Sequence, residues 1–550
     1  MKFTKYFMPF AALALLASCS NDNISDPNVD QQKPGQLIDG KVYAAFNIAM
    51  PSVTGSRAEV LADGDAAEYA VKDGTILIFK QDGSSEGDYV YVTSGEVTDM
   101  AWEMNGSPTD QITSDSKTAV AAFEGMELDL EGSDVYYALV VLNKNSLGLS
   151  LTKNVSKFSD WQLAAQGTNA TVNNIIGTTT AGLTMTNAPQ LVGNASETLV
   201  QIDKTKISTV SSSNLTPAAT IYVQRIAAKI EIKPVSPKTF QDYTVEKPAG
   251  DASATPDHVK FTNWALDYSN DSTFPVQIVD GSYTGESTST SFGYAQWIQD
   301  GATQTGRFLA TGTFKRYYWA LDPNYDVTTA GKTYPTIFTD GTLTHITDAT
   351  NAITSSSNDY ITYCFENTME YNQMTLGNTT SVVLKGVYHK GNNTVDKHLV
   401  ALGSWIEEVP DDLPLKEEIT SGRSGIAIAD LFEEDEETVL KAFNLTENVE
   451  VDFYYEGNVF YTVPIRHFDD TETPKPNPMS SVNSYTPVHR GRFGLVRNNW
   501  YEVNINKVTG IGDPVPTPDP DDPDDPKDKQ YMDVKINILS WAKRSYTYDL

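Results

Sequence analysis

The sequence predicts an all-β protein made of antiparallel β-sandwiches with few short helices. From about Asp73 onward, short runs rich in Val, Ile, Thr, Tyr and Phe alternate with clusters of Gly, Asn, Asp and Ser, which is the spacing of sandwich strands. Helical periodicity is confined to two short segments, 429–443 and 159–165. The clearest expected strands are 75–79, 136–142, 221–232, 381–388 and 451–465.

Composition and charge narrow the class of protein. The chain has 550 residues, long enough for two or three domains, and its 40% hydrophobic content supplies a core to bury. Its 40 basic and 72 acidic residues give a net charge of -32. This charge opposes broad electrostatic contact with nucleic acid or with an anionic membrane surface. We therefore expect no nucleic-acid partner.

The N-terminus has the features of an export signal, expected over residues 1–18. A basic start precedes an apolar run, which ends in Leu16-Ala17-Ser18-Cys19. That ending resembles the bacterial lipobox, in which the thiol is acylated, for example with palmitate, and cleavage leaves Cys19 as the new N-terminus. The alternative is an ordinary secretory peptide that happens to end in Cys. No later apolar stretch approaches the roughly 20 residues that span a bilayer, so only the lipid would hold the precursor to a membrane.

The two cysteines of the chain are Cys19 and Cys364. Because Cys19 belongs to the targeting segment, Cys364 has no partner and no intramolecular disulfide is expected. Stability must then come from core packing and strand pairing.

Changes in composition divide the rest of the chain. The sequence changes character at Lys233-Pro234-Val235-Ser236-Pro237, after the long expected strand, and a domain boundary is expected there. Residues 513–529 are almost entirely Pro and Asp, so we expect an extended, solvated linker that reaches about 50 Å. The expected parts are a propeptide (19–57), an N-terminal sandwich (58–234), a C-terminal sandwich (235–512), the linker (513–529) and a terminal strand (530–550).

Two strongly alternating strands lie near opposite ends of the chain, each apart from an obvious sheet. In the first, the apolar face consists of Val42, Ala44, Phe46, Ile48 and Met50. In the second, the apolar face has the same period, and the alternation slips at its end, where a bulge or the end of the strand is expected. Its apolar residues are Met532, Val534, Ile536 and Ile538, followed by Leu539 and Trp541 at the slip.

Both strands need a groove, because each has one face to bury and a backbone to pair. If both fit the same groove, the first can fill it before assembly and the second, from a neighbouring molecule, can fill it afterwards. Arg57-Ala58, in a Gly/Ser loop after the first strand, would be an accessible protease site that releases the first strand. Burial of the second strand's apolar face is worth about 6–12 kcal/mol as an upper estimate. The alternative is that each strand belongs permanently to its own fold.

Catalytic and metal-binding patterns find little support. The six histidines are scattered without a zinc motif. Gly83-Ser84-Ser85-Glu86-Gly87 matches GxSxG formally, but no helix follows it, so we interpret it as a hairpin tip. The carboxylates of 519–525 lack the glycine and spacing of a calcium loop. Trp264, Trp297 and Trp319 could form a sugar platform, although buried core positions are more common for sandwich tryptophans. We predict no enzymatic activity, no cofactor and no metal.

Several of these features together resemble the Mfa- and FimA-type fimbrial subunits of Bacteroidetes, the type V pilins. The resemblance covers essentially the whole chain, and its most specific stretch is Arg497-Asn498-Asn499-Trp500-Tyr501-Glu502-Val503-Asn504-Ile505. The other features are the lipobox, Arg57-Ala58, residues 224–230, Asn263-Trp264-Ala265-Leu266, Glu366-Asn367-Thr368 and the terminal strand.

The resemblance implies two transthyretin-like sandwich domains and a pathway of assembly. The precursor would be a lipoprotein of the outer membrane, cut by an Arg-specific protease between Arg57 and Ala58. The cut subunit would polymerise into a surface fimbrium when Met532 to Trp541 of another copy fill the vacated groove. Expected partners are identical subunits, anchor and tip subunits, the protease, and host or bacterial surface receptors. The alternatives are an accessory or tip subunit, or a surface lipoprotein that binds glycans without polymerising.

Overall fold

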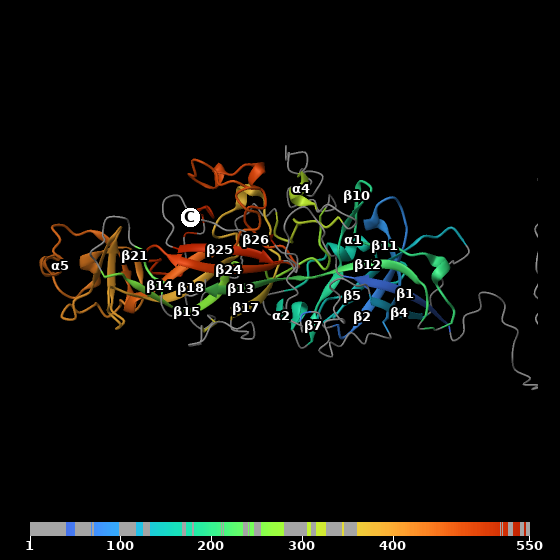
Figure 1. The fold of residues 1–550 in the computed structure, drawn as a ribbon, viewed down its shortest axis with the longest axis horizontal. Coiled ribbons are helices and arrows are strands. Elements are labelled where there is room, and N and C mark those ends of the chain that lie inside the picture. The colour runs from blue at the N-terminus through green and yellow to red at the C-terminus, as the bar shows by residue number, and fades with distance from the viewer. Residues whose placement is uncertain are drawn as a thin grey trace, which may run out of the picture.

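The computed structural model shows an elongated, all-β protein (Figure 1), which confirms the predicted fold class. It describes residues 40–49, 68, 71–97, 117–124, 132–167, 172–178, 181–210, 212, 214–234, 240, 243–246, 255–279, 297, 305–309, 315–325, 344–345, 360–516, 519, 521–525, 532–539 and 544–545.

The strands lie mainly in sheets at the two ends and the middle of the long axis in Figure 1. Their bounds are β1 (Lys41–Ala49), β2 (Gly74–Lys80), β3 (Val90–Glu96), β4 (Lys117–Glu124), β5 (Tyr136–Leu142), β6 (Gly177–Thr178), β7 (Gly182–Leu183), β8 (Met185–Asn187), β9 (Gln190–Val192), β10 (Ala195–Glu197), β11 (Val200–Gln201), β12 (Pro217–Arg225), β13 (Ala227–Pro234), β14 (Tyr243–Thr244), β15 (His258–Asp267), β16 (Thr344–His345), β17 (Ile361–Phe365), β18 (Ser381–His389), β19 (Leu399–Leu402), β20 (Trp405–Glu408), β21 (Arg423–Ala427), β22 (Glu450–Tyr454), β23 (Asn458–Pro464), β24 (Trp500–Val508), β25 (Met532–Leu539) and β26 (Arg544–Ser545). The α-helices are α1 (Phe158–Gln162), α2 (Val172–Ile176), α4 (Thr305–Phe308) and α5 (Glu436–Ala442).

The N-terminal sheet runs in the order β3-β2-β5-β8-β12-β1-β4, and β11 also pairs with β5. A bridge between Val97 and Ala121 joins the β3 side of the sheet to β4, so the sheet curls back toward itself around an apolar core. Gly95 permits this approach, because an added Cβ would lie 2.3 Å from the carbonyl oxygen of Ala122. This curled sheet contains β1, the strand predicted to be removable.

The C-terminal part packs two sheets face to face. One runs β17-β13-β24-β25-β26 and the other β14-β15-β18-β23, with β16 beside β15. One cluster of buried residues draws on both sheets, including Trp264, Leu384, Tyr501 and Val503. The two pairings of β1 with β12 and of β13 with β24 are parallel, whereas a fully antiparallel sandwich was expected.

A four-stranded sheet, β20-β19-β22-β21, extends from the end of the molecule opposite β1 in Figure 1. The expected helix over 429–443 is wrong in its first half, which forms a 3-10 turn at Ile428–Leu431. Helix α5 starts later because the Asp435 carboxylate caps it, accepting a hydrogen bond from the Thr438 amide at 2.9 Å. The expected strand over 451–465 is two strands, β22 and β23, separated by a turn in which Glu456 has a φ of 52°.

The expected strand over 221–232 is also two strands, which belong to different sheets. Strand β12 lies in the N-terminal sheet and β13 in the C-terminal one (Figure 1). Ile226 is the single residue between the two strands. Ile226 and Ala227 are fully buried in a core cluster that contains residues from both parts of the chain. The two halves therefore share an apolar junction at this point.

The acidic segment 513–529 was predicted to be a solvated linker, but part of it is buried. Asp524 and Asp525 are 4% and 5% exposed, and Asp513 pairs with Phe460 of β23. Burial raises the pKa of Asp524 well above its usual value, which favours the neutral carboxyl in contact with the Thr379 hydroxyl at 2.5 Å. Contacts with distant polar side chains outweigh the tendency of Pro and Asp to stay in water.

Candidate assembly site

Strand β1 occupies an interior place in the N-terminal sheet. It pairs in parallel with β12 on one side, from Ala45 opposite Pro217 to Ala49 opposite Tyr222. On its other side it pairs antiparallel with β4, from Lys41 opposite Glu124 onward. Both of its hydrogen-bonding edges are therefore used, and its removal would open a gap between two strands.

The predicted apolar face of β1 is buried in the core of the curled sheet. Val42, Ala44, Phe46 and Ile48 are at most 1% exposed. The Phe46 ring meets the Phe123 ring edge to face, with 6.5 Å between centroids. The space that β1 fills is thus an apolar slot, with β12 and β4 as its walls.

The other face of β1 makes polar contacts. The hydroxyl of Thr118, on β4, donates a hydrogen bond to the amide oxygen of Asn47 at 2.9 Å. The backbone groups of Tyr43 and Ser208 exchange two hydrogen bonds, each 2.8 Å long. Asn47 is half-buried at this surface, so its contact with Thr118 marks one register position along the slot.

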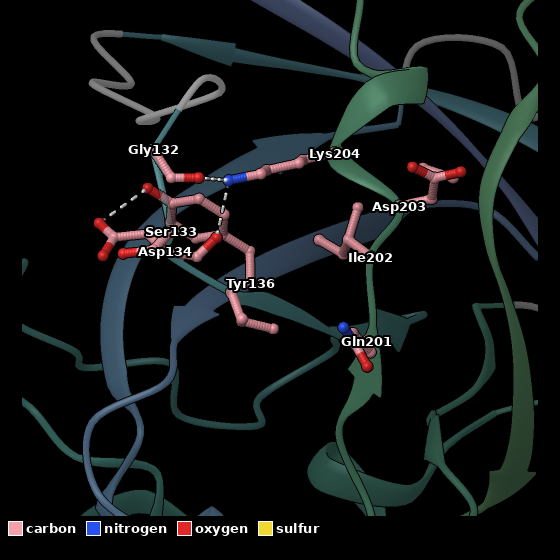
Figure 2. A pocket seen from close by; sticks show the side chains of 10 residues that line it. Gly132, Ser133, Asp134, Tyr136, Gln201, Ile202, Asp203 and Lys204 are labelled. Atoms are coloured by element: carbon pink, nitrogen blue, oxygen red, sulfur yellow. Dashed lines mark hydrogen bonds between the residues drawn. The ribbon is translucent and has the colours of Figure 1, made fainter.

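A hollow of about 550 Å³ lies at the end of the sheet beside this slot (Figure 2). Ala218, in its lining, is the extra residue of β12 at the bulge where β1 pairs. Lys204 closes over one side, donating to the carbonyl oxygens of Gly132 at 2.6 Å and Asp134 at 3.0 Å (Figure 2). Hydrogen bonds from Thr205 lower the pKa of Asp203, which keeps that carboxylate ionised. The hollow therefore has charged side chains, Asp134, Asp203 and Lys204, in its lining.

The predicted terminal strand forms β25 and pairs antiparallel with β24 of the same chain. It ends at Leu539, where the sequence predicted a bulge or the end of the strand. The expectation of a strand without a nearby sheet is wrong, because β24 offers it a long complementary edge. The register places Met532, Val534, Ile536 and Ile538 opposite four buried residues of β24: Val508, Ile505, Val503 and Tyr501.

The two halves repeat one pattern of pairing around these strands. In the N-terminal sheet, β8 is antiparallel to β12, β12 is parallel to β1, and β1 is antiparallel to β4. In the C-terminal sheet, β17, β13, β24 and β25 follow the same sequence of senses. The chain thus uses twice an arrangement in which one strand lies between a parallel and an antiparallel neighbour.

A buried ion pair fixes the chain shortly before β25. The Arg492 guanidinium donates from Nε and Nη2 to both carboxylate oxygens of Asp525, at 2.6 and 2.7 Å. Burial lowers the pKa of Arg492, but its hydrogen bonds to Asp525 and Asp470 outweigh this and raise it above its usual value. Six residues separate Asp525 from β25, so the strand can begin at most about 25 Å from this anchor.

Three of the motifs that carried the family resemblance, containing Arg225, Glu366 and Arg497-Asn498, meet at the junction between the halves. Arg497 and Glu366, both fully buried, form a charge-assisted pair in which Nε donates to Oε1 at 2.8 Å. The Asn498 side chain accepts from the amide and the guanidinium of Arg225, both at 3.2 Å. These long-range contacts account for motifs that lie far apart in the sequence.

A second buried ion pair at this junction, between Glu68 and Lys229, was not predicted from the sequence. The ammonium lies 2.6 Å from the carboxylate, and both side chains are at most 1% exposed. Burial raises the pKa of Glu68, but the charge and hydrogen bond of Lys229, together with the Tyr363 hydroxyl and the charge of Arg225, outweigh burial, so the pKa is lowered. Glu68 lies eleven positions after Arg57, and it fixes the start of the body that would remain after a cut there. The isolated Lys within the apolar run 226–230 was the available signal.

Five predicted site residues lie outside the described residues: Cys19, Met50, Arg57, Ala58 and Trp541. Their predicted roles remain predictions.

The GxSxG-like segment is a hairpin tip, as predicted, because β2 and β3 pair antiparallel on either side of it. The carboxylate of Glu86 there accepts hydrogen bonds from the amides of Thr198 and Leu199. Burial raises the pKa of Glu86 to about 8. Trp264, Trp297 and Trp319 are core residues, at most 2% exposed.

Other described residues with potential chemistry have structural partners. The buried His467 ring contacts the Tyr501 hydroxyl at 2.7 Å and the Tyr318 carbonyl oxygen at 2.6 Å. Over the ranges given above, the structure places no three His, Cys, Asp or Glu side chains so that they could hold a metal ion. Within the same ranges, no helix has the length and apolar character needed to cross a membrane.

The fold defines an all-β protein, and one segment of its sequence matches a known family. Residues 452–547 match the sequence model of the family described as major fimbrial subunit protein type IV, fimbrillin, C-terminal. This segment contains β23, β24 and β25. The match confirms, over this segment, the resemblance to the fimbrillin family. A comparison with curated proteins finds no match.

A comparison with solved structures finds proteins from three bacteria. A candidate cell adhesion protein of Bacteroides eggerthii is 12% identical, with a TM-score of 0.36 over 92% of this chain and 98% of that one. One from Parabacteroides distasonis is 10% identical, with a TM-score of 0.37 over 92% and 97%. The tip fimbrial protein Mfa3 of Porphyromonas gingivalis, truncated at its C-terminus, is 11% identical, with a TM-score of 0.30 over 91% and 100%. At these scores the structural likenesses add nothing to the family match.

Proposed function

We propose that this chain is a shaft subunit of an adhesive fimbrium. It is exported as a lipoprotein acylated at Cys19 and reaches the outer membrane as an inactive precursor. An Arg-specific protease cuts between Arg57 and Ala58, and β1 then leaves its slot. Met532 to Trp541 of another copy fill the slot and join the subunits. Anchor and tip subunits and surface receptors are its further partners.

The observation that carries this proposal is the interior place of β1 between β12 and β4. Loss of β1 leaves unpaired backbone groups on two strands and an apolar slot between them. Unpaired buried backbone groups are costly, so the emptied protein needs a replacement strand. A strand with matching alternation exists in every copy of the chain, at its C-terminal end.

The distribution of arginines supports cleavage at Arg57. An Arg-specific protease needs an accessible arginine in a flexible segment. Arg423 and Arg466 are half-buried, and Arg544 lies within β26. The other arginines among the described residues are at most 3% exposed: Arg225, Arg307, Arg316, Arg490, Arg492 and Arg497. Only Arg57 lies in the Gly/Ser loop between the expected propeptide strand and the body.

Treatment of the purified precursor with an Arg-specific protease is expected to give a chain that begins at Ala58 and forms SDS-resistant ladders. The Arg57→Gln precursor should stay uncut at this position and monomeric, because the first strand remains covalently attached. N-terminal sequencing and unheated SDS gels measure both results. A wild-type chain that begins at Ala58, keeps its C-terminal strand and remains monomeric contradicts the proposal.

Phe46→Ala is expected to destabilise only the uncut precursor. Removing this buried ring should lower the free energy of unfolding of the N-terminal part by about 3–5 kcal/mol. The assembled filament should be unaffected, because residue 46 has left with the propeptide. Phe123→Ala is the matched control. Phe123 stays in the body after cleavage, so its replacement should destabilise both the precursor and the filament. Denaturant unfolding followed by tryptophan fluorescence measures these changes, and an equal loss in precursor and filament from Phe46→Ala would count against removal of β1.

One observation favours a second candidate, a surface lipoprotein that binds glycans and never polymerises. The pairing of β25 with β24 gives the terminal strand a place in its own chain. Mass spectrometry of surface material separates the two candidates. An acylated Cys19 peptide on the functional form supports the lipoprotein, whereas an N-terminus at Ala58 supports the fimbrial subunit.

A further inference from the structure

We propose that the terminal strand enters the slot of the next copy in one direction and one register. In this register, Met532–Leu539 takes the place of 42–49, and Ile536-Asn537-Ile538 stands where Phe46-Asn47-Ile48 stands in the precursor. The inference rests on the proposed strand exchange and adds its orientation, its register and its polar contact.

The apolar positions of the slot select this register among those that keep the direction of β1. The apolar face of β1 has four positions with at most 1% exposure, at 42, 44, 46 and 48. The proposed register puts Met, Val, Ile and Ile there, in that order. A slip by two residues puts Gln530 at the first position or, in the other direction, Ser540 at the last. A slip by one residue, in either direction, puts Asp533, Lys535 and Asn537 at three of the four positions.

The polar face supplies an independent argument. Asn537 takes the position of Asn47, whose amide oxygen accepts a hydrogen bond from the Thr118 hydroxyl at 2.9 Å. The incoming strand therefore brings the same side chain to the same partner. Because Thr118 belongs to β4 of the receiving copy, this contact would join two subunits.

The backbone of the slot favours the direction of β1. Strand β12 carries an extra residue at Ala218, and this bulge fits a parallel partner, as β1 shows. A strand entering in the same direction can use the same backbone groups of β12 and β4. A strand entering in reverse would have to pair antiparallel across this bulge and would bring Asp533 to the position of Asn47.

Ala45 is the least matched position in the proposed register. It is fully buried beside the half-buried Tyr43 and Asn47, and Lys535 takes its place. The long aliphatic stem of a lysine can lie along a sheet while its ammonium reaches water. The position thus accepts Lys535 with the charge at the surface, between the sites of Tyr43 and Asn47.

Paired cysteines test the register in filaments of the full chain after cleavage. Asn47 and Thr118 are direct cross-strand partners, so Cα atoms at this pair lie within the range of a disulfide. Thr118→Cys with Asn537→Cys should give disulfide-linked oligomers on mild oxidation, seen on heated, non-reducing SDS gels. The remaining cysteine of the mature chain, Cys364, is buried and should not compete.

Three matched pairs separate the alternatives. Thr118→Cys is combined with Lys535→Cys or Leu539→Cys to detect a slip by two residues in either direction. It is combined with Asp533→Cys to detect the reversed strand. The register is supported if only the Asn537 pair links subunits in assembled filaments, and it is overturned if filaments form but another pair links instead. Failure of the wild-type chain to assemble overturns the proposed function as well.

A fifth pair is designed to hold β25 on its own sheet. Asn537 lies opposite Glu502 of β24 in the single chain. Glu502→Cys with Asn537→Cys should therefore close an intramolecular disulfide in the precursor. Cleavage should then give no filaments until the disulfide is reduced. Normal assembly with this disulfide closed overturns the proposal, because it would show that β25 need not leave β24.

Discussion

Filaments are expected to be lost when Ile536 is replaced by Asp. In the proposed assembly, Ile536 takes the place of Phe46, which is fully buried in the slot. A carboxylate without a partner in such a site costs several kcal/mol, comparable to the whole apolar gain from one or two buried side chains. Cleavage of Ile536→Asp should therefore give monomers, measured as the loss of SDS-resistant ladders and of fibres in electron micrographs.

Asn537→Asp is the matched control for this change. It introduces the same carboxylate one position along the strand, on the polar face. There it can still accept a hydrogen bond from Thr118, so assembly should persist. Circular dichroism should show that both variants keep the β-rich fold of the precursor. Ladders of normal length from Ile536→Asp would exclude this strand as the joining element.

The second large effect is expected from Asp525→Ala. This change leaves the Arg492 guanidinium, which is 1% exposed, without its bidentate partner. Removing one partner of a buried ion pair typically destabilises a protein by about 3–5 kcal/mol. Urea unfolding of the precursor should show a loss of this size in the transition of the C-terminal part.

Asp521→Ala provides the comparison within the same acidic run. Asp521 is exposed, so its loss should change stability by less than about 0.5 kcal/mol. Equal effects of the two substitutions would show that the segment lies free in water. The difference matters for assembly, because an anchor at Asp525 limits the reach of the terminal strand to about 25 Å rather than about 50 Å.

Local sequence patterns predicted where the strands lie in the chain better than which strands pair with one another. The alternation of Val42 to Ile48 and of Met532 to Ile538 identified β1 and β25, and hairpin spacing identified the turn between β2 and β3. The parallel pairing of β1 with β12 joins segments more than 150 residues apart, and nothing in either segment encodes that choice. The same limit hid the pairing of β25 with β24.

Composition was misleading where distant charges meet. The Pro and Asp run predicts a solvated linker, yet Arg492 lies 33 residues earlier and draws Asp525 into a buried pair. Strand β12 ends and β13 begins on either side of Ile226, and no Gly or Pro marks this boundary in the sequence. The chain changes sheet there because two cores pack around one junction. The residue pattern of 221–232 alone carries no information about that packing.

A structure of the assembled filament tests the central claim most directly. The account predicts that each slot between β12 and β4 holds residues 532–541 of an adjacent subunit, that Asn537 faces Thr118, and that no residue before Ala58 remains. A filament in which the slot still holds 42–49 of its own chain, with β25 on its own β24, would contradict it.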